Sequence, residues 1–320
     1  MAVRTPVTEL FELTYPIVLA PMGAVSGGEL AAAVSNAGGL GFVGGGYGDA
    51  DWLARELEIV TAQTRRAWGV GLITWSATKE SVELALSYRP DALFLSFGDP
   101  RPFVRPIKEA GCLLVCQVHD VAAAHEAQAI GADIVIAQGA EAGGHGALRA
   151  TLPLIPAVVD AVDPTPVLAA GGIGDGRGVA AALALGAAGA LIGTRFCVAE
   201  EALLHPVAKQ RLVSARGGDT QRTRVFDTVR EYSWPIPYTG RALRNRFLAQ
   251  WHDRDTALAE DTAELERYRA AGEAGDFDTA LIWAGEVVDL VDRIEPASVI
   301  FERIGHEAEA WLRQARTMVT

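Results

Sequence analysis

The sequence predicts an α/β fold, a (β/α)8 TIM barrel with a C-terminal helical extension. Eight short, nearly continuous apolar runs alternate with amphipathic or alanine-rich segments between residues 17 and 196. Such runs are typical of parallel strands buried on both faces, and their alternation with helices indicates a parallel sheet. After residue 198 the alternation gives way to helical patterns. A doubly wound sheet is the alternative, but it usually contains fewer strands in strict alternation.

The predicted strands are "IVLAPM" (17–22), "LGFVGG" (40–45), "WGVGLIT" (68–74), "ALFLSFG" (92–98), "LLVCQV" (113–118), "DIVIAQG" (133–139), "PVLAAGG" (166–172) and "GALIGTRF" (189–196). The first connecting helix is "SGGELAAAVSNAGG". Ser26 and Glu29 have capping-box spacing there, and Gly38 can end the helix. "VAAAHEAQAIGA" and "RGVAAALALGA" repeat this pattern before the sixth and eighth strands.

The C-terminal part begins with "VAEEALLHPVAKQRLVSA", a predicted helix, and continues with "RGGDTQRTRVFDTVR", an extended or loop segment. The remainder is predicted to be helical, and its acidic run from Asp253 to Glu266 is interpreted as a solvated helix face. We therefore predict that residues 1–200 form the barrel core. Residues 201–320 would form a helical extension that covers the active site and supplies the last barrel helix.

The composition favours a cytoplasmic protein that does not bind nucleic acid. The formal net charge is −12, whereas nucleic-acid surfaces need concentrated lysine and arginine. The three cysteines, Cys112, Cys116 and Cys197, are odd in number and lack CxxC spacing, which fits a reduced compartment. Cys112 and Cys116 are expected to pack as small apolar residues on one strand. No segment has the pattern of a signal peptide, and the longest apolar stretch is interrupted by glycines, so no membrane span is predicted.

Glycine-rich segments follow the last two predicted strands, where barrels of this type commonly bind phosphate. The predicted anion ligands are backbone N–H groups and one hydroxyl, from Gly171, Gly172, Gly193 and Thr194. The alternative is that these glycines only make tight turns. "GIGDGRG" also resembles a dinucleotide fingerprint, but no acidic residue ends a following strand at the usual distance.

His145 stands in "QGAEAGGHG", directly after the sixth predicted strand. The surrounding glycines leave space for a flat ligand and little local packing to hold the ring. Histidine can remove a proton from a carbon acid or hold an anion near neutral pH, so an active-site role is predicted. The alternative is a histidine hydrogen-bonded within a loop. The spacing of the histidines, cysteines and carboxylates predicts no metal site.

Other ring side chains are weaker candidates. His119 follows the fifth strand and could reach the barrel mouth, whereas His125 is placed on a surface helix. Trp75, Trp234, Tyr238 and Trp283 could form a pocket wall or simply pack in the core.

Several motifs together resemble the nitronate monooxygenase family: "PIVLAPMG", "QGAEAGGHG", "VLAAGGIGDGRGVAAALALGAAGALIGTRF" and "IWAGEVVDLVDRIEPA". The resemblance covers nearly the whole chain and implies a non-covalent FMN in the barrel of residues 1–200. It places His145 as the catalytic residue near the flavin and assigns the phosphate to the glycine segments described above. The other residues that it implies beside the flavin are Ala20, Pro21, Met22, Gln138, Ala142 and Gly143.

Two positions depart from the family pattern. Gly71 stands where many members have asparagine, and Gln117 stands where many have lysine. Both are kept as predicted flavin contacts. A neutral amide at position 117 can still hydrogen-bond the flavin but offers no cation to its reduced form.

The implied reaction is oxidation of an alkyl nitronate by O2 to a carbonyl compound and nitrite. For a neutral nitroalkane, His145 would first remove the α-proton. The same motifs resemble NAD(P)H:quinone and enoyl-thioester reductases, and a non-enzymatic FMN-binding barrel is a further alternative. Exposed apolar residues on the extension make a homodimer possible.

Overall fold

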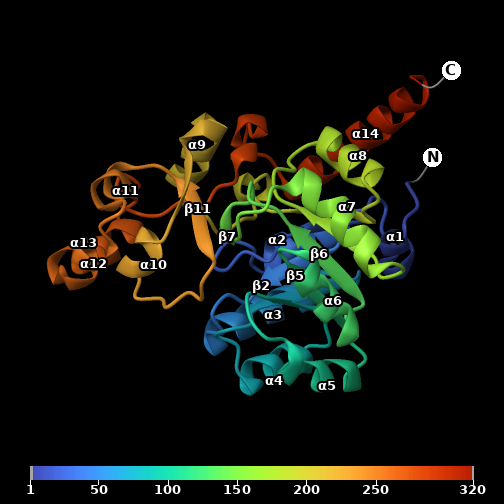
Figure 1. Cartoon of the computed structure of the whole chain (residues 1–320), viewed down its shortest axis with the longest axis horizontal. Coiled ribbons are helices and arrows are strands. Elements are labelled where there is room, and N and C mark those ends of the chain that lie inside the picture. Colours follow the sequence, from blue (N-terminus) through green and yellow to red (C-terminus); the bar gives the residue numbers. More distant parts are fainter. Residues whose placement is uncertain (1–2, 319–320) are drawn as a thin grey trace.

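The computed structural model describes residues 3–318, and its centre is a closed barrel of eight parallel strands (Figure 1). Neighbouring strands follow the order β1-β9-β8-β6-β5-β4-β3-β2. A parallel bridge between Val18 and Leu40 joins the first strand to the second and closes the ring. The predicted (β/α)8 fold is therefore confirmed. The strands are β1 Ile17–Leu19, β2 Gly41–Gly44, β3 Trp68–Ile73, β4 Ala92–Ser96, β5 Leu113–Val118, β6 Ile134–Gln138, β8 Val167–Ala170 and β9 Gly189–Ile192.

Only β5 coincides with its predicted run; the other runs extend beyond the C-terminal ends of their strands. The additional residues form the loops at the barrel mouth. Along each strand alternate side chains face opposite ways, so Phe94 fills the barrel while Leu93 and Leu95 pack against the outer helices. Burial on both faces explains why the runs are continuously apolar.

The outer helices are α2 Gly28–Asn36, α3 Ala50–Gln63, α4 Lys79–Ser87, α5 Arg101–Glu109, α6 Val121–Ala129, α7 Thr151–Val162 and α8 Gly176–Ala184. The C-terminal helix α14, Ala297–Arg316, packs against α8 and α2, between the first and last barrel helices (Figure 1). Gly38 has φ +101° directly after the end of α2, as predicted. The predicted capping box at Ser26 is wrong, because Gly27 is the N-cap and the Ser26 hydroxyl accepts from the Met22 N–H at 2.7 Å.

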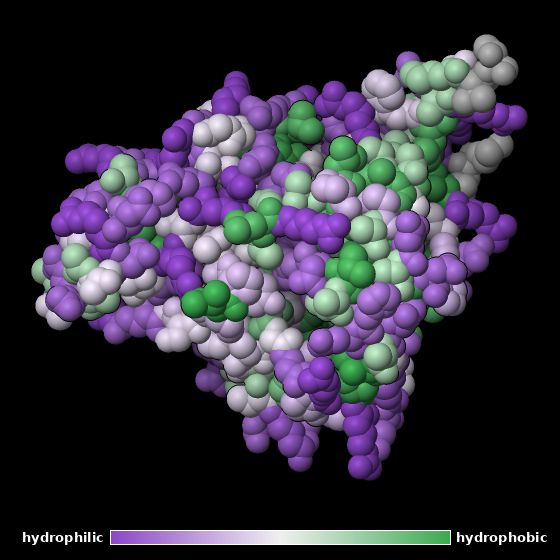
Figure 2. Space-filling model, viewed as in Figure 1, coloured by the Kyte–Doolittle hydropathy of each residue, from purple (hydrophilic) through white to green (hydrophobic). Residues whose placement is uncertain are grey.

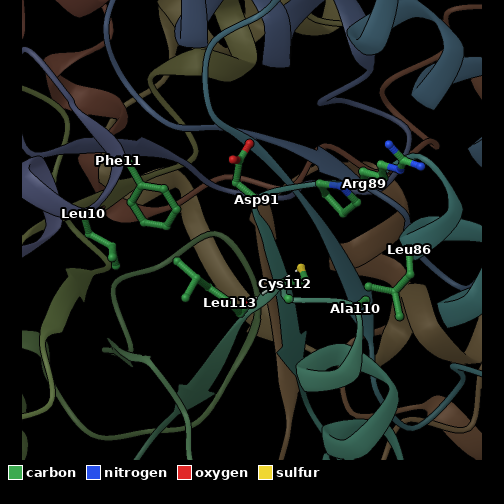
Figure 3. Close-up of a pocket in the computed structure, with 10 residues that line it drawn as sticks. Leu10, Phe11, Leu86, Arg89, Asp91, Ala110, Cys112 and Leu113 are labelled. Carbon is green, nitrogen blue, oxygen red and sulfur yellow. Dashed lines mark hydrogen bonds between the residues drawn. The ribbon is translucent and has the colours of Figure 1, made fainter.

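The N-terminal end of the barrel is closed by apolar side chains. Helix α1, Pro6–Phe11, places Phe11 in the same core cluster as Phe42 and Phe94. Figure 3 shows Leu10 and Phe11 beside Leu113 at a small pocket of about 390 Å³. The buried Cys112 thiol lies in this region, just before β5 rather than on it; Cys116 is on the strand and is also buried.

The segment between β9 and α14 differs from the predicted run of helices. The single helix predicted over residues 198–215 is a 3-10 turn, Phe196–Val198, followed by α9 Pro206–Ser214. The segment "RGGDTQRTRVFDTVR", predicted to be extended or a loop, contains the strand β10, but it also contains a 3-10 turn and the helix α10. The other elements are η2 Gly217–Asp219, β10 Thr220–Thr223, α10 Val225–Val229, β11 Thr239–Leu243, α11 Arg246–Trp251, α12 Asp255–Glu260, α13 Thr262–Glu273 and η3 Glu286–Leu290.

A second sheet joins this segment to the barrel. Strands β10 and β11 form an antiparallel pair, and β11 pairs on its other side with β7, Gly144–Gly146. In Figure 1 β11 and β7 lie between the barrel and the helices α10 to α13, which gather at one side of the molecule. His145 is opposite Gly240 in this sheet. The end of the glycine-rich segment, Gly144–Gly146, is thus a paired strand and not an open loop.

The face seen in Figure 2 is dominated by polar and charged residues, with apolar residues scattered among them. No helix among residues 3–318 is long and apolar enough to cross a membrane.

Candidate active site

A cavity of about 880 Å³ opens at the C-terminal ends of the barrel strands. Residues 229–287 of the segment after β9 contribute to its wall beside the barrel loops. All of the sequence-predicted site residues line this one cavity: Ala20, Pro21, Met22, Gly71, Gln117, Gln138, Ala142, Gly143, His145, Gly171, Gly172, Gly193 and Thr194. Their roles toward a ligand remain predictions.

One end of the cavity offers backbone donors. Gly171 and Gly172 follow β8 with φ of +101° and +72°, conformations that favour glycine. Within residues 3–318, no protein group accepts a hydrogen bond from the N–H groups of Gly172, Gly193 or Thr194. The Thr194 hydroxyl oxygen accepts from the Gly285 N–H at 3.0 Å. Unpaired N–H groups at this position suit an anion such as a phosphate.

Local packing explains why position 71 is glycine in this chain and not asparagine. A Cβ added at Gly71 would lie 2.2 Å from Pro21 Cβ, which is far inside van der Waals contact. The Pro21 ring therefore occupies the space that a larger side chain at position 71 would need. A side chain here would require Pro21, itself a cavity-lining residue, to move.

Gln117 belongs to a polar cluster beside the cavity. Its amide donates to Gln138 Oε1 at 3.2 Å, and His119 Nε2 lies 2.8 Å from the same oxygen. His119 is buried, stacks against Phe97 and lies behind Gln138. Burial lowers the pKa of His119 to about 4, so the ring is neutral at pH 7. The cluster fixes two cavity-lining amides.

His145 is tightly packed, contrary to the expectation of little local packing. The residue is 8% exposed, and its ring stacks on Trp234 with centroids 3.4 Å apart and planes 6° apart. Trp283 meets the ring at an angle of 65°. The sequence analysis missed this packing because the contacting residues lie about 90 or more positions away along the chain.

The imidazole of His145 has a buried carboxylate partner. His145 Nε2 lies 2.8 Å from Asp227 Oδ1, and the two side chains are 6% and 4% exposed. Burial lowers the pKa of His145, while the hydrogen bond and charge of Asp227 oppose that shift. Asp227 Oδ2 is buried, with no hydrogen-bond partner among residues 3–318. Such an unsatisfied buried atom is uncommon and requires an explanation.

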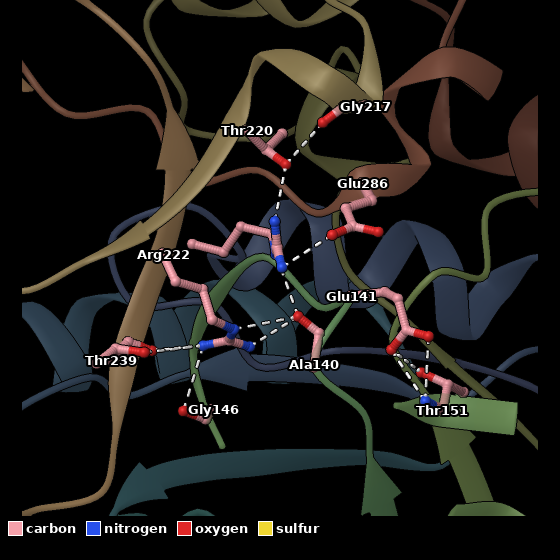
Figure 4. A network of polar contacts seen from close by, with 10 residues as sticks. Ala140, Glu141, Gly146, Thr151, Gly217, Thr220, Arg222, Thr239 and Glu286 are labelled. Carbon is pink, nitrogen blue, oxygen red and sulfur yellow. Dashed lines mark hydrogen bonds and ion pairs between the residues drawn. The ribbon is translucent and has the colours of Figure 1, made fainter. Parts of the chain in front are cut away.

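Two arginines of the second sheet hold the loop before β7 (Figure 4). Arg222 Nη2 and Arg241 Nε both donate to the Ala140 carbonyl, at 2.9 and 3.1 Å. Arg222 also donates to the Gly146 carbonyl at 3.2 Å, whereas Arg241 pairs with Glu286 at 2.8 Å. Arg222 has no carboxylate partner in the described chain, and burial lowers its pKa to about 10. The segment that carries His145 is thus fixed on both sides.

Aromatic rings and a third arginine form another part of the wall. Trp234 Nε1 donates to the Tyr47 hydroxyl at 3.0 Å, and Tyr47 stacks on Tyr232 with centroids 3.9 Å apart. Arg230 lies over the Tyr232 ring at 4.7 Å and lines the cavity. Arg230 Nη1 is buried, and no acceptor for it occurs in the described chain. An unpaired guanidinium nitrogen at a cavity wall suits an anionic ligand.

Of the four aromatic residues predicted as candidates for the pocket wall, two line the cavity and two pack behind it. Trp234 and Trp283 line the cavity. Trp75 packs behind Trp234 at 5.5 Å, and Tyr238 packs against Phe97 at 5.1 Å. His125 is exposed on α6, as predicted.

Sequence reasoning missed Asp227, Arg222 and Arg230. A sequence clue was available for two of them, since Asp227 is the one charged residue in "VFDTV" and Arg230 follows three positions later. No group of three or more potential metal ligands occurs within residues 3–318.

Comparisons with known proteins find a matching family model and several similar proteins. Residues 4–79 and 72–307 match the family model described as nitronate monooxygenase. A nitronate monooxygenase of Neurospora crassa is 30% identical over 93% of this chain and 90% of its own length. Among solved structures, FabK from Thermotoga maritima is 33% identical with a TM-score of 0.88, covering 99% of this chain and 100% of FabK. The nitroalkane oxidase of Streptomyces ansochromogenes is 31% identical with a TM-score of 0.83, covering 97% and 99% of the two chains.

Proposed function

The chain belongs to the nitronate monooxygenase family of oxidoreductases, and we propose that it oxidises alkyl nitronates with O2 to carbonyl compounds and nitrite. FMN is the proposed cofactor. Neutral nitroalkanes are a further substrate class in this proposal.

The residues of the cavity fit FMN. The unpaired N–H groups of Gly172, Gly193 and Thr194 suit its phosphate, and Gln117 and Gln138 can hydrogen-bond the polar edge of its ring system. Ala20, Pro21 and Met22 offer backbone along the cavity wall. When bound, FMN would supply the redox chemistry by accepting electrons from the substrate and passing them to O2.

One observation carries the proposal: His145 and the unpaired Arg230 line the same cavity as the glycine N–H groups. Arg230 would attract and orient the negative charge of a nitronate. The aromatic wall of Trp234 and Trp283 would exclude water from the bound substrate. For a neutral nitroalkane, His145 would accept the α-proton as a general base.

The test is a paired assay of the purified, FMN-loaded protein. We expect oxygen uptake and nitrite release with propionate-3-nitronate, and slower oxidation of NADH in the presence of a quinone. Rapid anaerobic bleaching of the flavin by NADH or NADPH, with no oxygen uptake on adding the nitronate, would overturn the proposal.

A flavin-dependent reductase is the second candidate, favoured by the 33% identity and TM-score of 0.88 to FabK. A pyridine nucleotide is also anionic, so Arg230 suits either ligand. The paired assay separates the two activities. Bound FMN without either activity would instead indicate a non-enzymatic binding protein.

A cytoplasmic location and a homodimer are also proposed. The large apolar side chains at the surface that a dimer would cover include Leu148, Leu152 and Ile236. Light scattering at several protein concentrations measures the oligomeric state. A monomeric mass at every concentration would contradict the dimer.

A further inference from the structure

We infer that Asp227 is a positioning residue that keeps the His145 proton on Nε2, so that Nδ1 is free to accept a proton from a neutral carbon-acid substrate. The catalytic part of this inference rests on the proposed function. It gives a role to a residue of α10 whose side chain forms a hydrogen bond to His145 and to no other group in the described chain.

The hydrogen bond between His145 and Asp227 determines which ring nitrogen carries the proton. An ionised carboxylate only accepts hydrogen bonds, so Asp227 Oδ1, 2.8 Å from His145 Nε2, requires a proton on that nitrogen. Nδ1 of the neutral ring then carries the lone pair. No residue within 3–318 hydrogen-bonds to Nδ1, and the His145 ring lines the cavity.

The plane of the His145 ring is also fixed. Stacking on Trp234, at 3.4 Å and 6°, fixes the plane of the imidazole. The carboxylate of Asp227 then fixes the rotation of the ring within that plane by holding Nε2. Together the stack and the hydrogen bond leave one ring orientation, in which Nδ1 has no hydrogen-bond partner among residues 3–318.

Asp227 is itself buried. Its side chain is 4% exposed, and its only hydrogen bond in the described chain is to His145, because Oδ2 has no partner. A buried carboxylate with one hydrogen bond is a poor source of stability. Its position is explained if it acts on the histidine.

Burial and the nearby charges act on the pKa of His145 in opposite directions. Burial lowers this pKa most, Asp227 raises it and so favours proton uptake, and Arg230, just past the end of α10, and Arg222, on β10, lower it further. During proton transfer the substrate C–H bond breaks. Its electron pair stays on the substrate as the nitronate, and the proton moves to Nδ1. The resulting imidazolium is stabilised by Asp227, without any further reactant.

The experiment uses Asp227→Asn in the FMN-loaded protein, with Asp255→Asn as the matched control. Asp255 also has a buried, unpaired carboxylate oxygen, but it does not contact His145. With neutral nitroethane, kcat/KM of D227N should fall by about 100-fold or more, because general-base catalysis depends on the histidine. With preformed ethyl nitronate the loss should be at least about tenfold smaller. Asp255→Asn should affect both substrates equally.

A second readout needs no activity. Nitrogen-15 NMR of histidine-labelled wild-type protein without substrate should show His145 as the Nε2–H tautomer, assigned by comparison with His145→Gln. In Asp227→Asn this preference should weaken or reverse. Asp227→Glu, which keeps a carboxylate, should restore part of the nitroethane rate.

An Nδ1–H tautomer in the wild type, or equal losses on nitroethane and its nitronate, would overturn the inference. If the wild type oxidises neither substrate, the proposed function fails, while the NMR experiment still tests the role of Asp227. The wild-type tautomer also decides the matter if D227N does not fold.

Discussion

Asp91 and Asp133 at the N-terminal end of the barrel and Asp227 at the C-terminal end have opposite kinds of partner. At the N-terminal end Asp91 accepts from the Trp68 N–H at 3.0 Å, and Asp133 accepts from the Leu114 N–H at 2.7 Å and the Lys108 ammonium at 2.6 Å. At the C-terminal end Asp227 has one oxygen on His145 and the other unpaired in the described chain. Asp91 and Asp133 at the base bind the backbone of the barrel, whereas Asp227 at the mouth binds the His145 side chain.

Backbone donors show the same contrast. Around Asp91 the backbone groups pair with one another. The Asp91 N–H donates to the Trp68 carbonyl, and the Leu113 N–H donates to the Asp91 carbonyl. At the mouth the N–H groups of Gly172 and Gly193 have no acceptor in residues 3–318. The hydrogen bonds at the base therefore stabilise the barrel, whereas the N–H groups at the mouth are available to a ligand, as expected of this fold. Changes at the mouth should alter activity, and changes at the base should alter stability.

The largest expected effect is at the mouth. His145→Ala should lower kcat/KM for a neutral nitroalkane by roughly 10²–10⁴-fold, because it removes the proposed general base. Flavin content and the melting temperature are measured beside the rate. Undiminished activity in a folded, FMN-loaded variant would show that His145 has no catalytic role.

At the base, Phe11→Ala should lower the free energy of unfolding by about 3–5 kcal/mol, the usual cost of truncating a buried phenylalanine. Phe11 packs with Phe42 and Phe94 inside the barrel. Urea unfolding measures the loss. The kcat/KM per folded molecule should not change, and a selective loss of activity at full stability would break the comparison.

Asp133→Ala should cost about 1–3 kcal/mol, because it leaves the Leu114 N–H without an acceptor at a buried strand. Lys108 also loses its partner, but that pair is partly exposed and adds little. Thermal or urea unfolding provides the measurement. A role for Asp133 in substrate turnover would appear as a change in kcat/KM, which we do not expect.

The smallest expected effect is the response of stability to pH. The pKa of His119 is about 4 in the folded protein and about 6.5 in the unfolded chain, so the unfolded state binds more protons between these values. Stability is therefore complete above pH 6.5 and is lost as the pH falls toward 4. His119 alone should remove about 2 kcal/mol between pH 7 and pH 5.

Urea unfolding at both pH values, with His119→Gln as the comparison, measures how much His119 contributes to the loss of stability. The glutamine does not titrate and can keep a hydrogen bond to Gln138. The variant should lose less stability than the wild type on acidification; an identical loss would contradict the assignment.

Local sequence patterns determined the barrel and the composition of its mouth. Apolar runs of strand length, alternating with helices, place the loops that follow β6, β8 and β9 at the same end. Residues as distant as Ala20 and Thr194 could therefore be predicted to line one site. His145 was identifiable because its neighbours in the sequence are glycines.

Only the tertiary structure decided how His145 is held. Its hydrogen-bond partner Asp227 is 82 residues away, and its stacking partner Trp234 is farther still. Strand β7 is three residues long, and glycine has low strand propensity, so no local pattern predicts its pairing with β11. Such contacts depend on the register of the second sheet and on the packing of α10. For that reason the sequence predicted space around His145, whereas the folded protein surrounds it with Trp234, Trp283 and Asp227.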